Sequence, residues 1–229
     1  MSSGGNISVA VVIPAFDCED TIGAVTAGAR RHASDVVVVS DGSRDDTAGV
    51  ARSAGGRVET LRENRGKGVA LRRGIDLALE RAPDLLVLMD ADGQHDPDDL
   101  PALIEAGRSG DFDLIVGSRL QDAARIPSAR YWTNYIGTRA LTWMTGYTLL
   151  DSQSGYRVMT AELARRMNLR AAGYAIETEM LIKAAKLGAR LGHVRVRTIY
   201  NSETSHFQPF ADTIRILLAA IQFQIEDQP

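Results

Sequence analysis

The chain has 229 residues, of which 45% are hydrophobic and 24% charged, and its formal net charge is −3. This composition supports a full hydrophobic core and excludes intrinsic disorder, and the slight acidic excess argues against a general nucleic-acid binder. The charge is unevenly distributed, because residues 1–114 carry 12 basic and 20 acidic side chains, whereas residues 115–170 carry 8 basic and 3 acidic ones. We therefore expect different segments of the chain to meet different partners.

Two further features bear on the compartment. Cys18 is the only cysteine, so no internal disulfide can form, which is typical of a reducing environment. No apolar run reaches the roughly 18–20 residues of a membrane span, and the opening residues MSSGGN lack the basic and apolar regions of a signal peptide. We expect a cytoplasmic protein whose contact with the cytoplasmic face of a membrane, if it has one, is peripheral.

Short apolar runs alternate with helical patterns in the first half of the chain. Strands are predicted at 7–14, 35–40, 58–61, 85–90 and 113–118, and helices at about 20–32, 43–55, 66–82 and 98–107. Ser43 and Asp46 resemble a capping box at the start of the second helix, and Gly55 can end that helix. The alternation predicts an α/β fold with one mostly parallel sheet and helices on both faces.

The pattern changes after residue 120. Strands are predicted at 155–160 and 193–200, and helices at 130–147, 176–188 and 210–225. No linker rich in proline and serine interrupts the chain, so we expect a single domain over residues 1–229.

Polar side chains follow several of the predicted strands. Asp17, Asp41 and the pair Asp90 and Asp92 come at or just after strand ends, and Arg119 follows the fifth strand. Ligands of open α/β sheets bind beyond the carboxyl ends of the strands. The sequence therefore predicts a site at this edge of the sheet.

The segment LLVLMDADGQHDPDD is the most informative stretch. Alternate residues of a strand share a face, so Asp90 and Asp92 are expected to point the same way, with the amide oxygen of Gln94 two residues on. Such hard oxygen ligands suit Mg²⁺ or Mn²⁺ holding a diphosphate. Two alternatives stay open: the carboxylates merely end a strand and cap a helix, or Asp90 is the nucleophile and Asp92 the acid/base of a DxD phosphatase.

Common nucleotide motifs are missing. A dinucleotide site would need G-x-G-x-x-G after the first strand, where this chain has PAFDCED. A Walker A loop would need Ser or Thr after Lys67, and Gly68 stands there.

Several blocks together resemble a known family. VVIPAFDCEDTI, VVSDGSRDDT, ENRGKGVALRRGI, LMDADGQHDP and VGSR resemble a family-two glycosyltransferase with the GT-A fold. The later blocks DSQSGYRVM, AIETEMLIKAAKLG, RVRTIY and SETSHFQPFADTIRIL are similar to its polyprenyl-phosphate branch, which contains the dolichyl-phosphate mannose synthases. The resemblance covers roughly residues 7–217. It implies a Rossmann-like, mixed and mostly parallel sheet.

The resemblance also implies roles for particular residues. A donor-binding half, 7–119, would precede an acceptor-binding half, 120–208, and a C-terminal amphipathic helix, 209–229. The nucleotide-sugar-binding residues would be Pro14, Phe16, Asp17, Glu19, Asp41, Lys67, Asp90, Ala91 and Asp92. The metal, Mg²⁺ or Mn²⁺, would be held by Asp90, Asp92 and Gln94, and the acceptor phosphate would be met by Arg119, Arg130 and Asn134. The family usually has Asn-Glu where Asp17 and Cys18 stand and a second acidic residue where Ser40 stands, which leaves the base open.

These features favour an inverting transfer of a hexose from a nucleotide sugar, GDP-mannose or UDP-glucose, to a polyprenyl phosphate. The phosphate acceptor would be its own nucleophile, and Asp92 would act in catalysis through the metal. Arg157 joins the arginines expected at the acceptor phosphate, because a guanidinium binds phosphate by two bonds. For a saccharide hydroxyl acceptor, which stays an alternative, a base is needed, and Asp151 is the candidate. A phosphatase and a non-catalytic sugar-nucleotide-binding module are the other classes.

Two amphipathic helices bear on partners. The helix at 130–147 carries Trp132 and Trp143, whose stripe fits either a core or a peripheral membrane contact. The helix at 210–225 has fewer charges, which favours docking or a homodimer contact.

Overall fold

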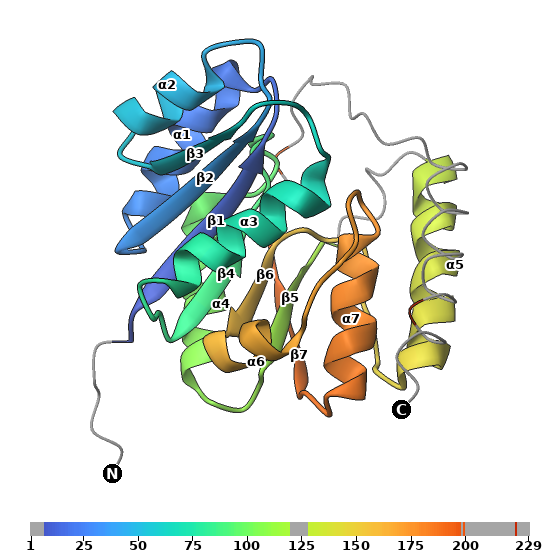
Figure 1. Ribbon diagram of the computed structural model, residues 1–229. Helices are drawn as coiled ribbons and strands as arrows, with labels where there is room; N and C mark the ends of the chain where they lie inside the picture. Colours follow the sequence, from blue (N-terminus) through green and yellow to red (C-terminus); the bar gives the residue numbers. More distant parts are fainter. Residues whose placement is uncertain (1–6, 120–127, 198, 200–222, 224–229) are drawn as a thin grey trace.

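The computed structural model describes residues 7–119, 128–197, 199 and 223, and for residues 128–134 the backbone alone. One seven-stranded sheet runs through the described residues in the order β3-β2-β1-β4-β6-β5-β7 (Figure 1). The strands are β1 (Val9–Ala15), β2 (Asp35–Asp41), β3 (Arg57–Leu61), β4 (Leu85–Leu88), β5 (Leu114–Ser118), β6 (Arg157–Thr160) and β7 (Leu191–Arg195). β6 is antiparallel to β4 and to β5, and the other pairs are parallel.

Helices cover both faces of this sheet. They are α1 (Glu19–Arg30), α2 (Thr47–Ser53), α3 (Lys67–Leu79), the 3₁₀ turn η1 (Pro97–Asp99), α4 (Leu100–Arg108), α5 (Ser128–Thr145), α6 (Ala161–Arg166) and α7 (Ile176–Lys186). Side chains of α1, α2 and α4 share one apolar cluster, and those of α3, α5, α6 and α7 share another. α5 packs alongside α7 at one end of the molecule (Figure 1).

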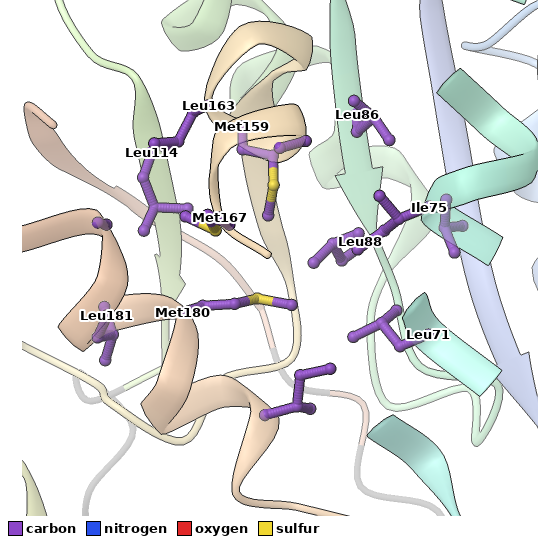
Figure 2. Packing of buried hydrophobic residues seen from close by; sticks show 14 of the residues in the cluster. Leu71, Ile75, Leu86, Leu88, Leu114, Met159, Leu163, Met167, Met180 and Leu181 are labelled. Atoms are coloured by element: carbon purple, nitrogen blue, oxygen red, sulfur yellow. The ribbon is translucent and has the colours of Figure 1, made fainter. Parts of the chain in front are cut away.

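The two clusters follow from the strand period. In β1, Val11 and Ile13 belong to the cluster under α1, whereas Ala10 and Val12 belong to the cluster under α3, because successive side chains point to opposite faces. Both faces of the central strands are therefore buried, which explains their continuous apolar runs. In Figure 2, Leu71 and Ile75 of α3 lie beside Leu86 and Leu88 of β4, and Met159, Met167 and Met180 fill the neighbouring part of the cluster.

The predicted elements of the first half are confirmed in type and order, with two corrections. The second helix begins at Thr47 and not at Ser43, because the Ser43 hydroxyl contacts the Ser40 hydroxyl (2.9 Å) and accepts a hydrogen bond from the Asp17 amide (3.2 Å). The predicted strand at 85–90 ends at Leu88, so Asp90 lies in the following turn. Gly55 does follow the end of α2, with a φ of +89°.

The second half differs more. β6 enters the sheet between β4 and β5, which the order of elements did not predict. β7 begins two residues before the predicted strand and ends at Arg195. The short helix α6 was not predicted; the Thr160 hydroxyl caps it by accepting a hydrogen bond from the Leu163 amide (3.2 Å). The predicted helix at 210–225 lies outside the described residues, apart from Phe223.

Within the described part of the chain, no helix combines the length and the apolar character that crossing a bilayer requires.

The start of α3 needs a residue without a side chain. The Gly68 amide donates to the Ala172 carbonyl (2.7 Å), and a Cβ at Gly68 would lie 2.3 Å from the carbonyl oxygen of Ala171. We expect Gly68→Ala to lower the free energy of unfolding by about 1–3 kcal/mol, because backbone cannot move aside as a flexible side chain can. Gly137→Ala in α5 is the control: nothing described lies within 4 Å of its Cβ, and alanine should stabilise the helix by about 0.5–1 kcal/mol. Urea unfolding of both variants measures the difference; equal midpoints would contradict the close contact.

Candidate active site

The loops that carry the predicted site residues meet at one edge of the sheet. β1, β2 and β4 run parallel, so the residues after Ala15, Asp41 and Leu88 lie at their shared carboxyl edge. β6 runs the opposite way, and Arg157 pairs with Leu88, so the segment before β6 reaches the same edge. The chain thereby brings residues 151–156 to the Asp90 turn.

Asp17 and Glu19 join the loop after β1 to the loop after β2. The Asp17 carboxylate accepts a hydrogen bond from the Arg44 amide (2.7 Å), and Glu19 Oε2 accepts one from the Asp46 amide (2.9 Å). Asp17 has a φ of +45°, a backbone conformation that aspartate adopts more readily than most residues. Pro14 is buried within β1, and the Phe16 ring beyond its end is partly exposed.

Asp41 holds the segment that leads into α3. This carboxylate is buried, and its oxygens accept hydrogen bonds from the amides of Arg65 (2.9 Å) and Gly66 (2.7 Å). Gly66 has a φ of +91°, and a Cβ there would lie 2.7 Å from the carbonyl oxygen of Ala172. Asp41 therefore fixes the backbone from which the Lys67 side chain begins.

Lys67 lies between two carboxylates. Its Nζ is 2.6 Å from Asp90 Oδ1 and 2.6 Å from Glu177 Oε1, which belongs to the first turn of α7. Burial alone would lower the pKa of Lys67, but the two carboxylates outweigh it and raise the pKa above its ordinary value. Burial would likewise raise the pKa of Asp90, and the Lys67 ammonium reverses this and lowers it to about 2. Lys67 and Asp90 are therefore both charged at neutral pH.

Asp92 belongs to a tight turn and not to a strand. Its Oδ1 accepts a hydrogen bond from the Gln94 amide (2.9 Å), and Gly93 between them has a φ of +72°. The Ala91 carbonyl accepts a hydrogen bond from the Thr21 hydroxyl (2.7 Å), which anchors the turn to α1. Asp90 and Asp92 are therefore positioned by this turn and not by the alternation of side chains along a strand.

The donor set of this turn fits Mg²⁺ or Mn²⁺. Two carboxylates and an amide oxygen are hard ligands, and these ions commonly complete their shell with substrate phosphates and water. No group of three His, Cys, Asp or Glu side chains that could hold a metal occurs among the residues whose side chains are described.

Arg119 and Asp151 form an ion pair next to this turn. The Arg119 guanidinium donates to Asp151 Oδ2 (2.9 Å) and Oδ1 (3.3 Å), and Asp151 is almost completely buried. Burial would lower the pKa of Arg119, but Asp151, and further away Asp90 and Asp92, outweigh it and raise the pKa. The structure thus places a fixed cation within electrostatic reach of both turn carboxylates.

Comparison with known proteins decides the family. Residues 10–167 match the family described as Glycosyl transferase family 2. The chain belongs to this family. It is therefore a glycosyltransferase, and the predicted GT-A type fold is confirmed.

Relatives of this glycosyltransferase carry informative names. An undecaprenyl-phosphate mannosyltransferase of Micrococcus luteus is 34% identical over 202 residues, covering 82% of this chain and 82% of the relative. A UDP-N-acetylglucosamine–dolichyl-phosphate N-acetylglucosaminyltransferase of Methanococcus voltae is 30% identical over 214 residues, covering 83% and 85%. Among solved structures, glucosyl-3-phosphoglycerate synthase of Mycobacterium tuberculosis shares the fold, with a TM-score of 0.75, 21% identity, and coverage of 95% of this chain and 80% of that one.

The prediction that Arg157 contacts the acceptor phosphate is wrong. Arg157 is fully buried at the start of β6, and its guanidinium donates to the backbone carbonyls of Ser152 (2.8 Å), Ser154 (2.9 Å) and Glu177 (2.7 Å). These bonds join the 151–156 segment to α7 and leave no surface for a phosphate. Arg130 and Asn134 belong to α5, but their side chains lie outside the described residues.

Two residues near the turn were not predicted to contribute. Glu177 holds Lys67 from a position 110 residues along the chain, and no local motif marks that contact. His95 is buried and stacked on Tyr156, with ring centroids 4.7 Å apart. Its Nδ1 accepts a hydrogen bond from the Asp90 amide (3.1 Å), and burial lowers its pKa to about 4, so the neutral ring supports Asp90 at pH 7.

Proposed function

We propose that this glycosyltransferase moves a hexose from a nucleotide sugar to a polyprenyl phosphate, with Mg²⁺ or Mn²⁺ and with inversion at the anomeric carbon. GDP-mannose and UDP-glucose are the leading donors. Residues 7–119 would bind the donor and residues 120–208 the acceptor, within one domain. The protein would meet its lipid acceptor as a peripheral protein at the cytoplasmic face of a membrane.

The Arg119–Asp151 pair beside the Asp90 turn is the observation that carries this proposal. A donor diphosphate with its metal is expected at Asp90 and Asp92, and an acceptor phosphate next to it needs a cation. Arg119 offers a planar guanidinium at that place, and Asp151 holds it by two bonds. The names of the Micrococcus and Methanococcus relatives support the acceptor class independently.

The proposed reaction requires little proton transfer by side chains of the protein. A phosphate monoester has a second pKa of about 6, so at pH 7 it is mostly a dianion and can attack the anomeric carbon directly. The nucleoside diphosphate leaves from the opposite face, which gives inversion. When bound, the metal would stabilise the charge that develops on this leaving group. Arg119 would orient the attacking phosphate, Asp90 and Asp92 would fix the metal, and Lys67 would lie near the diphosphate.

A panel of donors and acceptors tests the proposal. GDP-mannose, UDP-glucose and UDP-N-acetylglucosamine are each incubated with a short-chain polyprenyl phosphate in detergent, with Mn²⁺ or with EDTA. A lipid-linked sugar should form with at least one donor, and only with metal. If no donor gives a lipid product, or if sugar passes to water-soluble saccharides without any lipid, the proposed acceptor is wrong. Phosphate release without a nucleotide sugar would instead indicate a phosphatase.

A further inference from the structure

Lys67 forms an ion pair with Asp90, one of the two carboxylates proposed to bind the metal. Its ammonium is 2.6 Å from Asp90 Oδ1, and the Lys67 side chain is only 18% exposed. A divalent cation and an ammonium ion are alternative partners for such an oxygen, since both carry positive charge and both replace its water. In this structure Asp90 Oδ1 is therefore already paired with a cation.

We infer that Lys67 holds Asp90 until a nucleotide diphosphate arrives and then turns toward that diphosphate, so that the metal binds together with the nucleotide and only weakly before it. Lys67 is thus a positioning residue that orders metal and donor binding. The inference rests on the proposed function, because it takes Asp90 as a metal ligand.

Glu177 gives Lys67 a second partner for this exchange. Glu177 Oε1 is 2.6 Å from the ammonium, and its Oε2 is buried with no hydrogen-bond partner among the described residues. A buried oxygen without a hydrogen bond is unfavourable. When a metal binds Asp90, the Lys67 ammonium can therefore donate to this second Glu177 oxygen as well. Lys67 can therefore release Asp90 without leaving its own charge unpaired. The Tyr174 ring, 5.7 Å from Nζ, stands beside the same ammonium.

The surrounding charges favour joint binding. Before the donor arrives, Lys67 offsets Asp90, and Arg119 lies within electrostatic reach of both turn carboxylates. These cations weaken the attraction of the turn for a divalent ion. A bound diphosphate offsets the charge of Lys67 and supplies oxygen ligands to the metal, so it raises the affinity for the metal. By linkage, the metal raises the affinity for the nucleotide by the same factor.

The test is a titration of Mn²⁺ followed by its electron paramagnetic resonance signal, with UDP, with GDP and without nucleotide. A protein-free titration subtracts the Mn²⁺ bound by the nucleotide itself. In the unmodified protein, one of the two nucleotides should raise Mn²⁺ affinity at least about tenfold. Lys67→Met should bind Mn²⁺ without nucleotide about tenfold more tightly than the unmodified protein and lose most of the nucleotide effect, because the competing charge is gone.

Three further variants, and a fourth as a replacement, complete the test. Glu177→Gln should have the opposite effect, weaker Mn²⁺ binding with nucleotide by about threefold, because Lys67 then depends on Asp90 alone. Lys67→Arg keeps the charge and should keep weak nucleotide-free binding. Lys183→Met is the matched control, since Lys183 is a buried lysine of α7 paired with Glu179 (2.9 Å) away from the turn, and it should leave Mn²⁺ binding unchanged. Lys67→Gln replaces Lys67→Met if methionine prevents folding, with the same expected direction.

Two outcomes separate this inference from the proposed function. If Lys67→Met binds nucleotide-free Mn²⁺ no more tightly than the unmodified protein, or if nucleotide leaves the affinity of the unmodified protein unchanged, the ordering role of Lys67 is wrong while the metal site stands. If the unmodified protein binds no Mn²⁺ with either nucleotide, the metal dependence in the proposed function fails as well.

Discussion

Asp92→Asn is expected to lower kcat/KM for sugar transfer by about a thousandfold and to abolish Mn²⁺-dependent binding of the nucleotide sugar. The reason is the loss of one of the two carboxylate charges at the proposed metal site. Asparagine is the right replacement because its amide oxygen can still accept the hydrogen bond that Asp92 Oδ1 accepts from the Gln94 amide (2.9 Å). The turn should therefore keep its shape, and the loss can be assigned to charge.

The control for Asp92→Asn is Asp98→Asn, six residues along the same loop. Asp98 is exposed and pairs with Arg31 at the surface (2.8 Å), an arrangement that contributes little to stability. Activity of this variant should stay within about twofold of the unmodified enzyme, because the charges of an exposed pair are screened by solvent and salt. Isothermal titration with the nucleotide sugar, with and without Mn²⁺, gives the decisive comparison. Unchanged donor affinity in Asp92→Asn would contradict the metal assignment.

Much of the fold of residues 7–119 could be predicted because its signals are local. Runs such as VVVV at 36–39 are β-branched and continuous, which indicates a strand buried on both faces, and carboxylates directly after such runs must lie at the sheet edge. Asp41 and Asp90 were placed at that edge in this way. What the sequence could not predict is how their oxygens are used, since their partners, the Gly66 amide and Lys67, depend on how the 62–67 segment folds back.

The described residues after 128 were harder to predict because their contacts are long-range. The hydrophobic period of residues 155–160 predicts a strand but does not specify its neighbours, so the insertion of β6 between β4 and β5 was missed. Arg157 was misjudged for the same reason. An arginine is seldom fully buried, and only the carbonyls of the 152–154 segment and of Glu177, gathered by the tertiary fold, make its burial favourable.

Arg119→Ala is expected to lower kcat/KM by about a hundredfold, chiefly through a higher KM for the polyprenyl phosphate, with a much smaller change in the KM for the donor. Asp151→Asn should raise the same acceptor KM about tenfold, because Arg119 loses its charged partner and with it a fixed orientation. The matched control is Asp113→Asn at the other end of β5. Asp113 accepts two bonds from the Arg190 guanidinium (2.8 and 3.0 Å), so it repeats the pair away from the site.

The Asp151 variant also separates two roles for that carboxylate. If Asp151 positions Arg119, the two residues act as one unit, and kcat/KM of the double variant Arg119→Ala/Asp151→Asn should be little lower than that of Arg119→Ala alone. The pH profile of kcat should also keep its shape. If Asp151 were a general base for a hydroxyl acceptor, Asp151→Asn would lower kcat at an unchanged acceptor KM and remove the acid limb of the profile. We expect the first outcome, because both Asp151 oxygens already accept hydrogen bonds, two from the Arg119 guanidinium and one from the Gln153 amide (3.1 Å), as expected of a residue that holds Arg119 in place.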